Sequence, residues 1–304
     1  MDITALKSIL TEYAIEPIDV ALIRESSDNQ LFKIVAAEGV YALRKAKRTK
    51  TETIDFEAQL IERLMSQSIS TPQWMQTKSG KFYVTVDDGS VVVLMEYLTA
   101  EPVGEAHIAT YAQKAGALLA TIHTATQDVT ITAEQNRTIY SELERVIAQQ
   151  DFFTATFEDG NEFVERVKQY VQTAQEKDDS KCIIHNDFRP HNVLYSPKGE
   201  LYAIDFDWSC YGPAIKDFAH AAVEWSMLDG QDEPDADIHD AFVTGYMSSR
   251  PIEFLESDFN FWAAFSCLSD TATYICDKIL NQEELPERIR SYMYKKFKYF
   301  HAKE

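Results

Sequence analysis

The chain has 304 residues, of which 45% are hydrophobic and 26% are charged, a composition typical of a globular protein with a sizeable core. Its 29 basic and 49 acidic side chains give a net charge of −20, which repels phosphate backbones and anionic lipid and argues against nucleic-acid or membrane-surface partners. No apolar run approaches the roughly 20 residues that span a bilayer, and we see no basic stretch followed by an apolar run that would indicate a signal peptide. The four cysteines do not show the paired spacing of a metal site. We therefore expect a cytoplasmic protein with reduced thiols.

The first 98 residues predict a small, β-rich lobe. Strand-like runs occupy residues 30–35 and 40–44 on either side of a short turn, which is the pattern of a hairpin. A helix is expected over residues 53–66, where apolar side chains recur at helical spacing. Two more strands, 81–86 and 90–96, flank a turn whose Asp-Gly pair is a strong hairpin signal.

The remainder of the chain predicts a larger and mostly helical lobe. Apolar stripes at helical spacing indicate helices in four places, which are residues 107–125, 138–150, 161–176 and much of 215–304. A β segment at residues 182–206 interrupts them, and the sequence contains no internal repeat. We therefore expect an α+β fold with two domains, residues 1–98 and 99–304.

Inside the β segment, residues 193–195 and 201–204 read as two strands of a hairpin joined by turn-forming residues. Asn192 lies just before the first strand and Asp205 just after the second. Because antiparallel pairing brings such ends within about 5 Å of each other, we expect these side chains to lie side by side. Amide and carboxylate oxygens suit Mg²⁺, so Asn192 and Asp205 are the predicted metal ligands.

Asp187 adds a third oxygen-bearing side chain to the same loop, because it precedes Asn192 by five residues. Three such groups with a metal suggest phosphoryl transfer, which needs charge neutralisation and alignment more than covalent help. Asp187 would orient the acceptor hydroxyl and take its proton, while Asn192 and Asp205 hold Mg²⁺ on the phosphates of ATP. The alternative is that all three are turn and cap residues of an ordinary hairpin.

Several fixed spacings agree together in this region. His185 lies two residues before Asp187, and the pattern continues through a set of later residues: Asn192, Asp205, Phe206, Asp207, Gly212, Pro213, Asp217, Phe218 and Ala219. The set resembles the aminoglycoside phosphotransferase and choline kinase branch of the protein-kinase-like fold. The resemblance implies two lobes, an ATP- and Mg²⁺-dependent activity, and a bracing role for Asp217, which would accept backbone N–H bonds of the catalytic loop.

The resemblance extends to the strand that ends at Arg44. A kinase of this fold needs a cation on the α and β phosphates of ATP and a helix carboxylate to hold it, and these roles fall to Arg44 and Glu57. Strand alternation puts Ala42 on the same face as Arg44, where a small side chain fits under the adenine. Lys45 is one register slip away and stays an alternative, as does the reading of Arg44 and Glu57 as unrelated surface charges.

Residues 93–98 resemble the hinge of the family, or else form a buried edge strand. In a hinge, the carbonyl of Glu96 would accept from the adenine amino group and the amide of Leu98 would donate to the ring. The phosphate loop departs from the family pattern because residues 26–29 contain no glycine. Backbone amides and the Asn29 side chain would cover the phosphates there.

The chain leaves little room for a peptide acceptor, since only 12 positions separate Asp205 from Asp217, where protein kinases carry a long activation segment. This favours a small-molecule hydroxyl such as that of an aminoglycoside, an amino alcohol or homoserine. Residues 217–249 carry eight acids and no Lys or Arg, and they either attract a cationic acceptor or form a solvated loop. Three aromatic residues could wall a quaternary ammonium group or simply pack in the core: Trp208, Tyr211 and Trp225.

Three functions are consistent with these patterns. The favoured one is an ATP- and Mg²⁺-dependent kinase of a small-molecule hydroxyl. A protein Ser/Thr kinase built on the same lobes is the second. A nucleotide-binding pseudokinase is the third, and it is disfavoured because Arg44, Asp187, Asn192 and Asp205 all carry competent chemistry.

Overall fold

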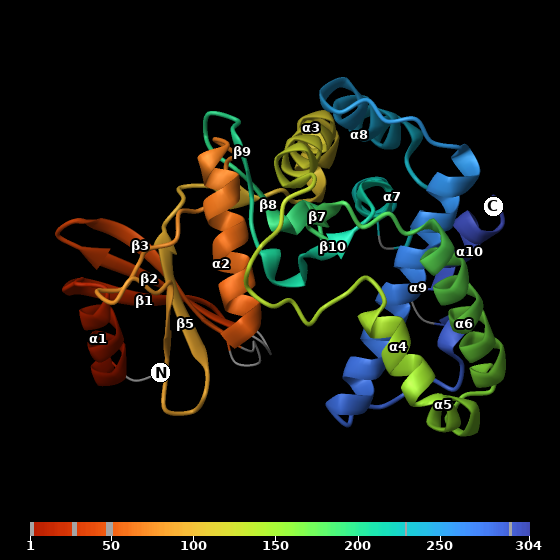
Figure 1. The fold of residues 1–304 in the computed structure, drawn as a ribbon, viewed down its shortest axis with the longest axis horizontal. Helices are drawn as coiled ribbons and strands as arrows, with labels where there is room; N and C mark the ends of the chain where they lie inside the picture. The colour runs from red at the N-terminus through yellow and green to blue at the C-terminus, as the bar shows by residue number, and fades with distance from the viewer. Residues whose placement is uncertain (1–2, 26–28, 47–50, 229, 292–293) are drawn as a thin grey trace. The chain divides into compact units, whose positions relative to one another are not determined.

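The computed structural model describes residues 3–25, 29–46, 51–228, 230–291 and 294–304. The chain forms two compact units. The first contains Met1–Glu101, Thr130–Asn136 and Leu194–Asp207, and the second contains Pro102–Val129, Arg137–Val193 and Trp208–Glu304. The first unit is rich in β-structure and the second is mostly helical, which confirms the predicted α+β class (Figure 1). The assignment of nucleotide binding to residues 1–98 and of catalysis to residues 99–304 stays a prediction.

A five-stranded antiparallel sheet dominates the first unit, with the order β1-β2-β3-β5-β4. Its elements in chain order are α1 (Ile3–Glu12), β1 (Pro17–Glu25), β2 (Asn29–Ala36), β3 (Gly39–Ala46), α2 (Thr51–Ser66), β4 (Tyr83–Thr85) and β5 (Val91–Glu96). Both predicted hairpins are present, β2 with β3 and β4 with β5. In the second hairpin Gly89 has a φ of +78°, a conformation that glycine adopts without the cost a Cβ would bring.

Helix α1 covers one face of this sheet (Figure 1). Its buried Leu6, Leu10 and Tyr13 belong to one apolar cluster with Phe32 of β2 and Leu43 of β3. Since successive side chains of a strand point to opposite faces, the neighbours of Leu43 point away from α1. Neither α1 nor β1 is among the predicted elements, although Ile18, Val20 and Leu22 alternate along β1; of these three side chains only Val20 is partly buried.

A small three-stranded sheet has the order β6-β8-β9, formed by β6 (Glu101–Pro102), β8 (Val193–Tyr195) and β9 (Leu201–Ala203). Strands β8 and β9 are the predicted hairpin. The turn between them is closed by a hydrogen bond of 2.9 Å from the Ser196 amide to the Glu200 carbonyl. The Ala203 amide also donates to the Ser70 carbonyl at 3.1 Å, which joins β9 to the segment that follows α2.

The second unit is built from helices and one short β pair. The helices are α3 (Ile108–Thr126), α4 (Ser141–Ala148), α5 (Gln150–Thr156), α6 (Gly160–Lys177), α7 (Ala214–Ser226), α8 (Ala236–Ser249), α9 (Glu256–Leu280) and α10 (Tyr294–His301). Strand β7 (Cys182–Ile184) pairs antiparallel with β10 (Cys210–Gly212). The described part of the chain also contains four short 3₁₀ helices, which are η1 (Glu105–His107), η2 (Pro190–Asn192), η3 (Phe206–Trp208) and η4 (Ile289–Ser291). All four cysteines are buried thiols without a disulfide partner.

Helices α3 and α8 pack unusually closely. A Cβ placed on Gly245 of α8 would lie 1.8 Å from the Gln113 carbonyl oxygen, and one on Gly116 of α3 would lie 2.0 Å from the Phe242 carbonyl oxygen. Only hydrogen at these two positions allows the backbones to approach so closely. The contact fixes α3, whose His123 side chain contacts Asp217 of α7.

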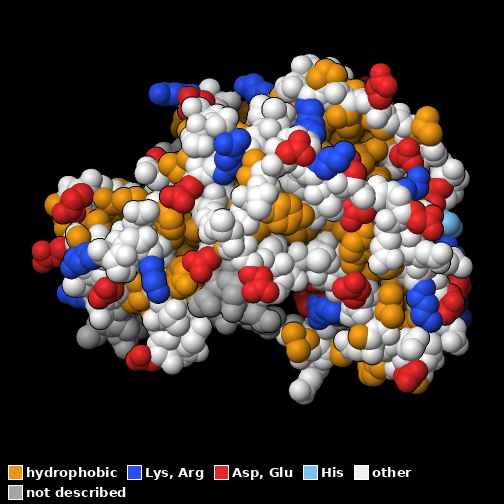
Figure 2. All heavy atoms as spheres, viewed as in Figure 1, with side chains coloured by type: hydrophobic (Ala, Val, Ile, Leu, Met, Phe, Trp, Pro, Cys, Tyr) orange, Lys and Arg blue, Asp and Glu red, His pale blue; other side chains and the backbone are white. Residues whose placement is uncertain are grey.

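Charged side chains are spread over the surface. On the face drawn in Figure 2, acidic and basic side chains are interspersed and no basic patch forms. Among the residues that the structure describes, no helix combines the length and the apolar character needed to cross a membrane.

Candidate active site

The register of the sheet decides which basic residue of β3 meets the helix carboxylate. Arg44 pairs with Val93 of β5, and its side chain points to the face opposite Leu43. There its Nη2 lies 2.6 Å from Oε2 of Glu57 on α2. Lys45 instead forms an ion pair of 2.5 Å with Asp88 in the β4–β5 turn. The predicted pairing of Arg44 with Glu57 is therefore present, and the register slip to Lys45 is not.

Asp205 also belongs to the Arg44 cluster. Its Oδ1 lies 3.5 Å from Nη1 of Arg44, and its side chain is 40% exposed, whereas those of Arg44 and Glu57 are 11% and 3% exposed. The backbone of Asp205 has a φ of +66°, a left-handed conformation that is unfavourable for most residues. Aspartate and asparagine adopt this conformation more readily than most residues, because their short polar side chains can form local hydrogen bonds.

Electrostatics keep Arg44 charged. Burial alone would lower the pKa of Arg44, but the carboxylates of Glu57 and Asp205 outweigh it and raise that pKa above its ordinary value. Nε of Arg44 is buried and has no hydrogen-bond partner among the described residues. A buried N–H group without a partner is costly, so Arg44 retains a donor that an anionic ligand can satisfy.

Ala42, Glu96 and Asn29 lie in strands of the same sheet, and Leu98 follows two positions after β5. Ala42 is buried and pairs with Met95, one position before Glu96, the exposed end of β5. No hydrogen bond joins the Leu98 amide to another described residue, so this donor is available to a ligand. Asn29 is half-buried at the start of β2, while residues 26–28 of the predicted phosphate loop lie outside the described residues.

In the second unit, a buried carboxylate braces residues 185–192, the predicted catalytic loop, as the sequence predicts. Asp217 of α7 accepts hydrogen bonds of 2.9 Å from the amides of His185 and Asn186. Asn186 has a φ of +65°, which an asparagine tolerates better than most residues. Nε2 of His123 on α3 lies 3.0 Å from Asp217, and Nδ1 lies 2.8 Å from the hydroxyl of Tyr246.

These contacts also set the charges of the brace. Burial would raise the pKa of Asp217, but the hydrogen bond from His123 and nearby positive charge hold that pKa below its usual range. Burial lowers the pKa of His123, which favours the neutral imidazole. A neutral His123 that donates from Nε2 to Asp217 and accepts from Tyr246 satisfies all three side chains.

The loop holds the Asp187 carboxylate from two sides. Nδ2 of Asn192 donates to Oδ2 of Asp187 at 2.8 Å and to the Asp187 carbonyl at 2.9 Å. Nε of Arg189 donates to Oδ1 of Asp187 at 2.5 Å. Asp187 and Asn192, both predicted site residues, thus meet in the second unit. Arg44, Glu57 and Asp205 meet in the first.

The two predicted metal ligands, Asn192 and Asp205, carry oxygen atoms of the kind that a hard cation binds. The amide nitrogen of the Asn192 side chain donates to Asp187. Among the described residues, no group donates a hydrogen bond to the amide oxygen of Asn192. Asp205 offers a partly exposed carboxylate. Amide and carboxylate oxygens are ligands that Mg²⁺ prefers, so each side chain, within its own unit, has the chemistry of a metal ligand, and the metal-binding role of Asn192 and Asp205 stays a prediction.

A cavity of about 400 Å³ opens beside Asp187 within the second unit. One wall is the catalytic loop and another is one face of α9, where residues 270, 273, 274 and 277 follow at helical spacing. The residues that matter most for what could bind there are Asp187, Arg189, Trp208, Asp270, Tyr274 and Asp277.

The acidic stretch 217–249 does not line this cavity among the described residues. Asp217 and Glu224 are buried in the interior, Asp232 pairs with Lys295 at 2.9 Å, and Asp235 caps α8. Asp229 lies outside the described residues. The acids of the cavity come instead from the catalytic loop, α9 and the segment after it.

The predicted aromatic residues divide between wall and core. Trp208 lines the cavity, and the Arg137 guanidinium lies 3.8 Å from the centre of its ring. Trp225 is fully buried, and its indole N–H donates to the Phe188 carbonyl at 3.1 Å. Tyr211 is part of β10 and does not line the described cavity.

Two residues near Asp187 are not predicted from the sequence pattern, Arg189 and Asp270. They are 81 positions apart, and only the packing of α9 beside the catalytic loop brings them to 2.9 Å. An arginine two positions after the predicted base was the one local signal available, because a cation so close in sequence is within reach of the carboxylate.

Comparison with known proteins gives a family and a fold. A sequence model of the phosphotransferase enzyme family matches residues 19–252, well over half of the chain. Aurora kinase B of Danio rerio is 35% identical over 78 residues, which cover 26% of this chain. The match spans only about a fifth of that relative, 21% of its length.

Solved structures of similar shape cover nearly the whole chain. Amicoumacin kinase in complex with AMP-PNP, Ca²⁺ and Ami has a TM-score of 0.77 at 17% identity, covering 100% of this chain and 94% of that one. Choline kinase LicA from Streptococcus pneumoniae has a TM-score of 0.68 at 16% identity and covers 99% of each chain. These likenesses show the kinase-like fold that the sequence predicts.

Proposed function

This chain belongs to the phosphotransferase enzyme family, and from that premise we propose that it transfers the γ-phosphoryl group of ATP to a hydroxyl of a small molecule, with Mg²⁺ as the required metal. The observation that carries the proposal is the Asp187 carboxylate, which is held on both oxygens and lines a cavity in its own unit. The fold shared with amicoumacin kinase and choline kinase supports it.

Asp187 would act on the acceptor. Its carboxylate has about four lone-pair directions, of which Arg189 and Asn192 use two. The remaining directions can accept the hydrogen bond of a hydroxyl in the cavity, orient its oxygen and receive its proton. Loop geometry that is fixed before the acceptor arrives lowers the entropy cost of this alignment.

The first unit would hold the nucleotide. Arg44, oriented by Glu57, would contact the α and β phosphates, while Ala42, the Glu96 carbonyl and the Leu98 amide would contact the adenine and Asn29 the phosphates. Asn192 and Asp205 would hold Mg²⁺. Bound ATP and Mg²⁺ supply the transferable phosphoryl group and neutralise its charge.

A protein acceptor is the second candidate, and the partial identity to Aurora kinase B is the observation in its favour. Against it, β10 begins five positions after Asp205 and α7 begins at Ala214, which leaves no extended platform for a peptide. We therefore favour an acceptor small enough for a cavity of about 400 Å³.

The test is an ATP-consumption screen with the whole chain and Mg²⁺ over aminoglycosides, amino alcohols, amino acids and sugars. The proposal expects at least one small acceptor to stimulate ATP use and to appear as its phosphate ester. Phosphorylated protein in a lysate with γ-labelled ATP, combined with no small-molecule hit, would favour the protein kinase. ATP binding without turnover on any acceptor would favour a pseudokinase.

A further inference from the structure

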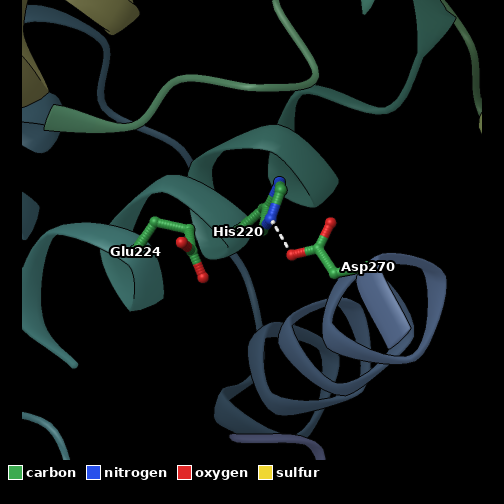
Figure 3. A group of neighbouring side chains, drawn as sticks. All are labelled: His220, Glu224 and Asp270. Atoms are coloured by element: carbon green, nitrogen blue, oxygen red, sulfur yellow. Dashed lines mark hydrogen bonds and ion pairs between the residues drawn. The ribbon is translucent and has the colours of Figure 1, made fainter. Parts of the chain in front are cut away.

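A cluster of titratable side chains lies in the second unit beside the catalytic loop. His220 and Glu224 project from one face of α7, and Asp270 faces them from α9 (Figure 3). Their ligand atoms all lie within 4.8 Å of one another, which is a spacing that could hold a metal ion. His220 Nε2 lies 3.0 Å from Asp270 Oδ2.

The protein's own cations already occupy this cluster. Arg189 places Nη2 at 2.9 Å from Asp270 and Nη1 at 3.4 Å from Glu224. Lys296 of α10 lies 2.7 Å from Glu224 on another side. A divalent ion would have to displace a guanidinium and an ammonium group, so the cluster is better explained as a socket for Arg189.

Arg189 connects the socket to the predicted base. All three nitrogens of its guanidinium meet a carboxylate, because Nε binds Asp187 while the two terminal nitrogens bind Glu224 and Asp270. Burial would lower the pKa of Arg189, but these three carboxylates raise it well above its ordinary value. The planar guanidinium therefore stays charged and is fixed at three points.

The Asp187 carboxylate is consequently held from two sides. Arg189 binds Oδ1 and Asn192 binds Oδ2, so rotation of the carboxylate would break one or both hydrogen bonds. We propose that Arg189 is a positioning residue, which uses the Glu224–Asp270 socket to hold the Asp187 carboxylate in the orientation that receives the acceptor's proton. This inference rests on the proposed function, because it presumes that Asp187 is the base.

An arginine suits this role better than a lysine. A lysine ammonium is a compact point charge on a flexible stem, and it lacks the rigid fork that meets three carboxylates at once. The structure therefore predicts that Arg189→Lys keeps the charge but loses much of the alignment. Arg189→Gln should lose both, and it also leaves Glu224 and Asp270 with fewer partners.

The first experiment compares Arg189→Gln and Arg189→Lys with the wild-type chain and with Arg166→Gln. Arg166 is a matched control because its side chain is 23% exposed, against 21% for Arg189, and it also forms an ion pair, here with Glu162 at 3.3 Å. We expect Arg189→Gln to lower kcat about 100-fold, the usual cost of misplacing a reacting group by about 1 Å. Arg189→Lys should be intermediate, and Arg166→Gln should stay within about twofold of wild type.

Rates are measured with water as the acceptor and with the small molecule that gives the highest rate in the screen. The KM for ATP should stay within about twofold in every variant, because Arg189 does not belong to the predicted nucleotide site. A kcat of Arg189→Gln within twofold of wild type would overturn the inference, as would an equal loss in Arg166→Gln. A loss that appears only in the KM for ATP would overturn it as well.

A double-mutant cycle separates this inference from the proposed function. If Arg189 acts through Asp187, the double variant Asp187→Asn/Arg189→Gln should have the same kcat as the single variant Asp187→Asn. Additive losses would contradict a positioning role. Full activity of Asp187→Asn would overturn the role assigned to Asp187 and with it this inference, whereas only the failure of every small acceptor in the screen would overturn the proposed function.

Equilibrium dialysis of the wild-type chain against Zn²⁺ and Mn²⁺ tests the metal reading directly. If the cluster is a socket for Arg189, it binds no metal ion, so His220→Ala should not change the amount of Zn²⁺ or Mn²⁺ that the chain binds. Stoichiometric binding that His220→Ala abolishes would show a metal in place of the Arg189 socket and would overturn the inference.

Discussion

At the scale of single residues, each unit contains a group of predicted site residues in which every carboxylate has a defined partner. Asp187 meets Asn192 and Arg189 in one unit, and Asp205 and Glu57 meet Arg44 in the other. Glu57 is nearly fully buried, whereas Asp205 is 40% exposed. A buried carboxylate orients its partner, and an exposed one remains able to bind a ligand.

The exposure of Asp205 leads to a prediction about nucleotide binding. We expect Asp205→Ala to weaken ATP binding in Mg²⁺ by about tenfold or more, equivalent to about 1.4 kcal/mol. Binding of ATP in EDTA should change much less, because the lost group is a metal ligand. Isothermal titration calorimetry in the two buffers measures both affinities.

Asp88→Ala is the control for this substitution. Asp88 also pairs with a basic residue of β3, Lys45, and its side chain is 56% exposed. It has no predicted role in the site, so both affinities should match those of the wild-type chain. If Asp205→Ala bound MgATP as tightly as Asp88→Ala does, Asp205 would not be a metal ligand.

At the scale of elements, α7 carries the groups that hold the catalytic loop in place. Asp217 binds two loop amides, Glu224 binds Arg189, and Trp225 binds the Phe188 carbonyl. Helix α3 supports this arrangement through His123. The loop is thus attached to helices along much of its length, which is what a preorganised site requires.

The brace at Asp217 predicts a pH-dependent loss of stability. Because the folded-state pKa of Asp217 lies below its unfolded value of about 3.9, its contribution is complete above that pH and declines as the pH falls below it. Asp217→Asn should cost about 3 kcal/mol of unfolding free energy at pH 7, because the carboxylate accepts from His123 and from two loop amides, and an amide in its place leaves a buried donor unpaired. Urea denaturation at pH 7, 5 and 3 should show the same deficit at pH 7 and 5 and a smaller one at pH 3.

Asp235→Asn serves as the control for the brace. Asp235 is exposed and caps α8 by accepting from the Ile238 amide at 3.1 Å, a role that asparagine performs equally well. Its unfolding free energy should differ from wild type by less than about 0.5 kcal/mol at each pH. A deficit of Asp217→Asn that grew toward pH 3 would contradict the assigned charge state.

The close contact of α3 with α8 gives a second prediction at this scale. Gly116→Ala and Gly245→Ala should each lower the unfolding free energy by about 1–3 kcal/mol, because the added methyl group meets backbone that cannot yield easily. Gly104→Ala is the control, since nothing lies within 4 Å of a Cβ there. Thermal or urea denaturation of all three variants measures the difference, and equal stabilities would show that α3 and α8 can separate at little cost.

At the scale of the whole molecule, the sequence predicts most of the architecture. Hairpins with strong turn residues and helices with apolar stripes form where they are expected, because local signals determine them. No strand was predicted at β1, although Ile18, Val20 and Leu22 alternate along it, and Ile18 and Leu22 are exposed in the structure.

The site was predictable only in part, and for a related reason. Residues joined by short spacings, such as Asp187 with Asn192, can be found from the motif that contains them. The contacts of Arg189 with Asp270 and of His123 with Asp217 span 81 and 94 positions. Such pairs depend on how helices pack, and a single sequence contains no local pattern for them.

The measurement that tests the central claim most directly is the single-turnover transfer of phosphate from MgATP to the best acceptor of the screen, by wild type and by Asp187→Asn. MgATP affinity is measured on the same samples. We expect Asp187→Asn to bind MgATP within about twofold of wild type and to lose about 10²- to 10⁴-fold in the transfer rate, the range that proton acceptance by a positioned side chain contributes. A transfer rate equal to that of wild type, in a variant that binds MgATP normally, would contradict the account.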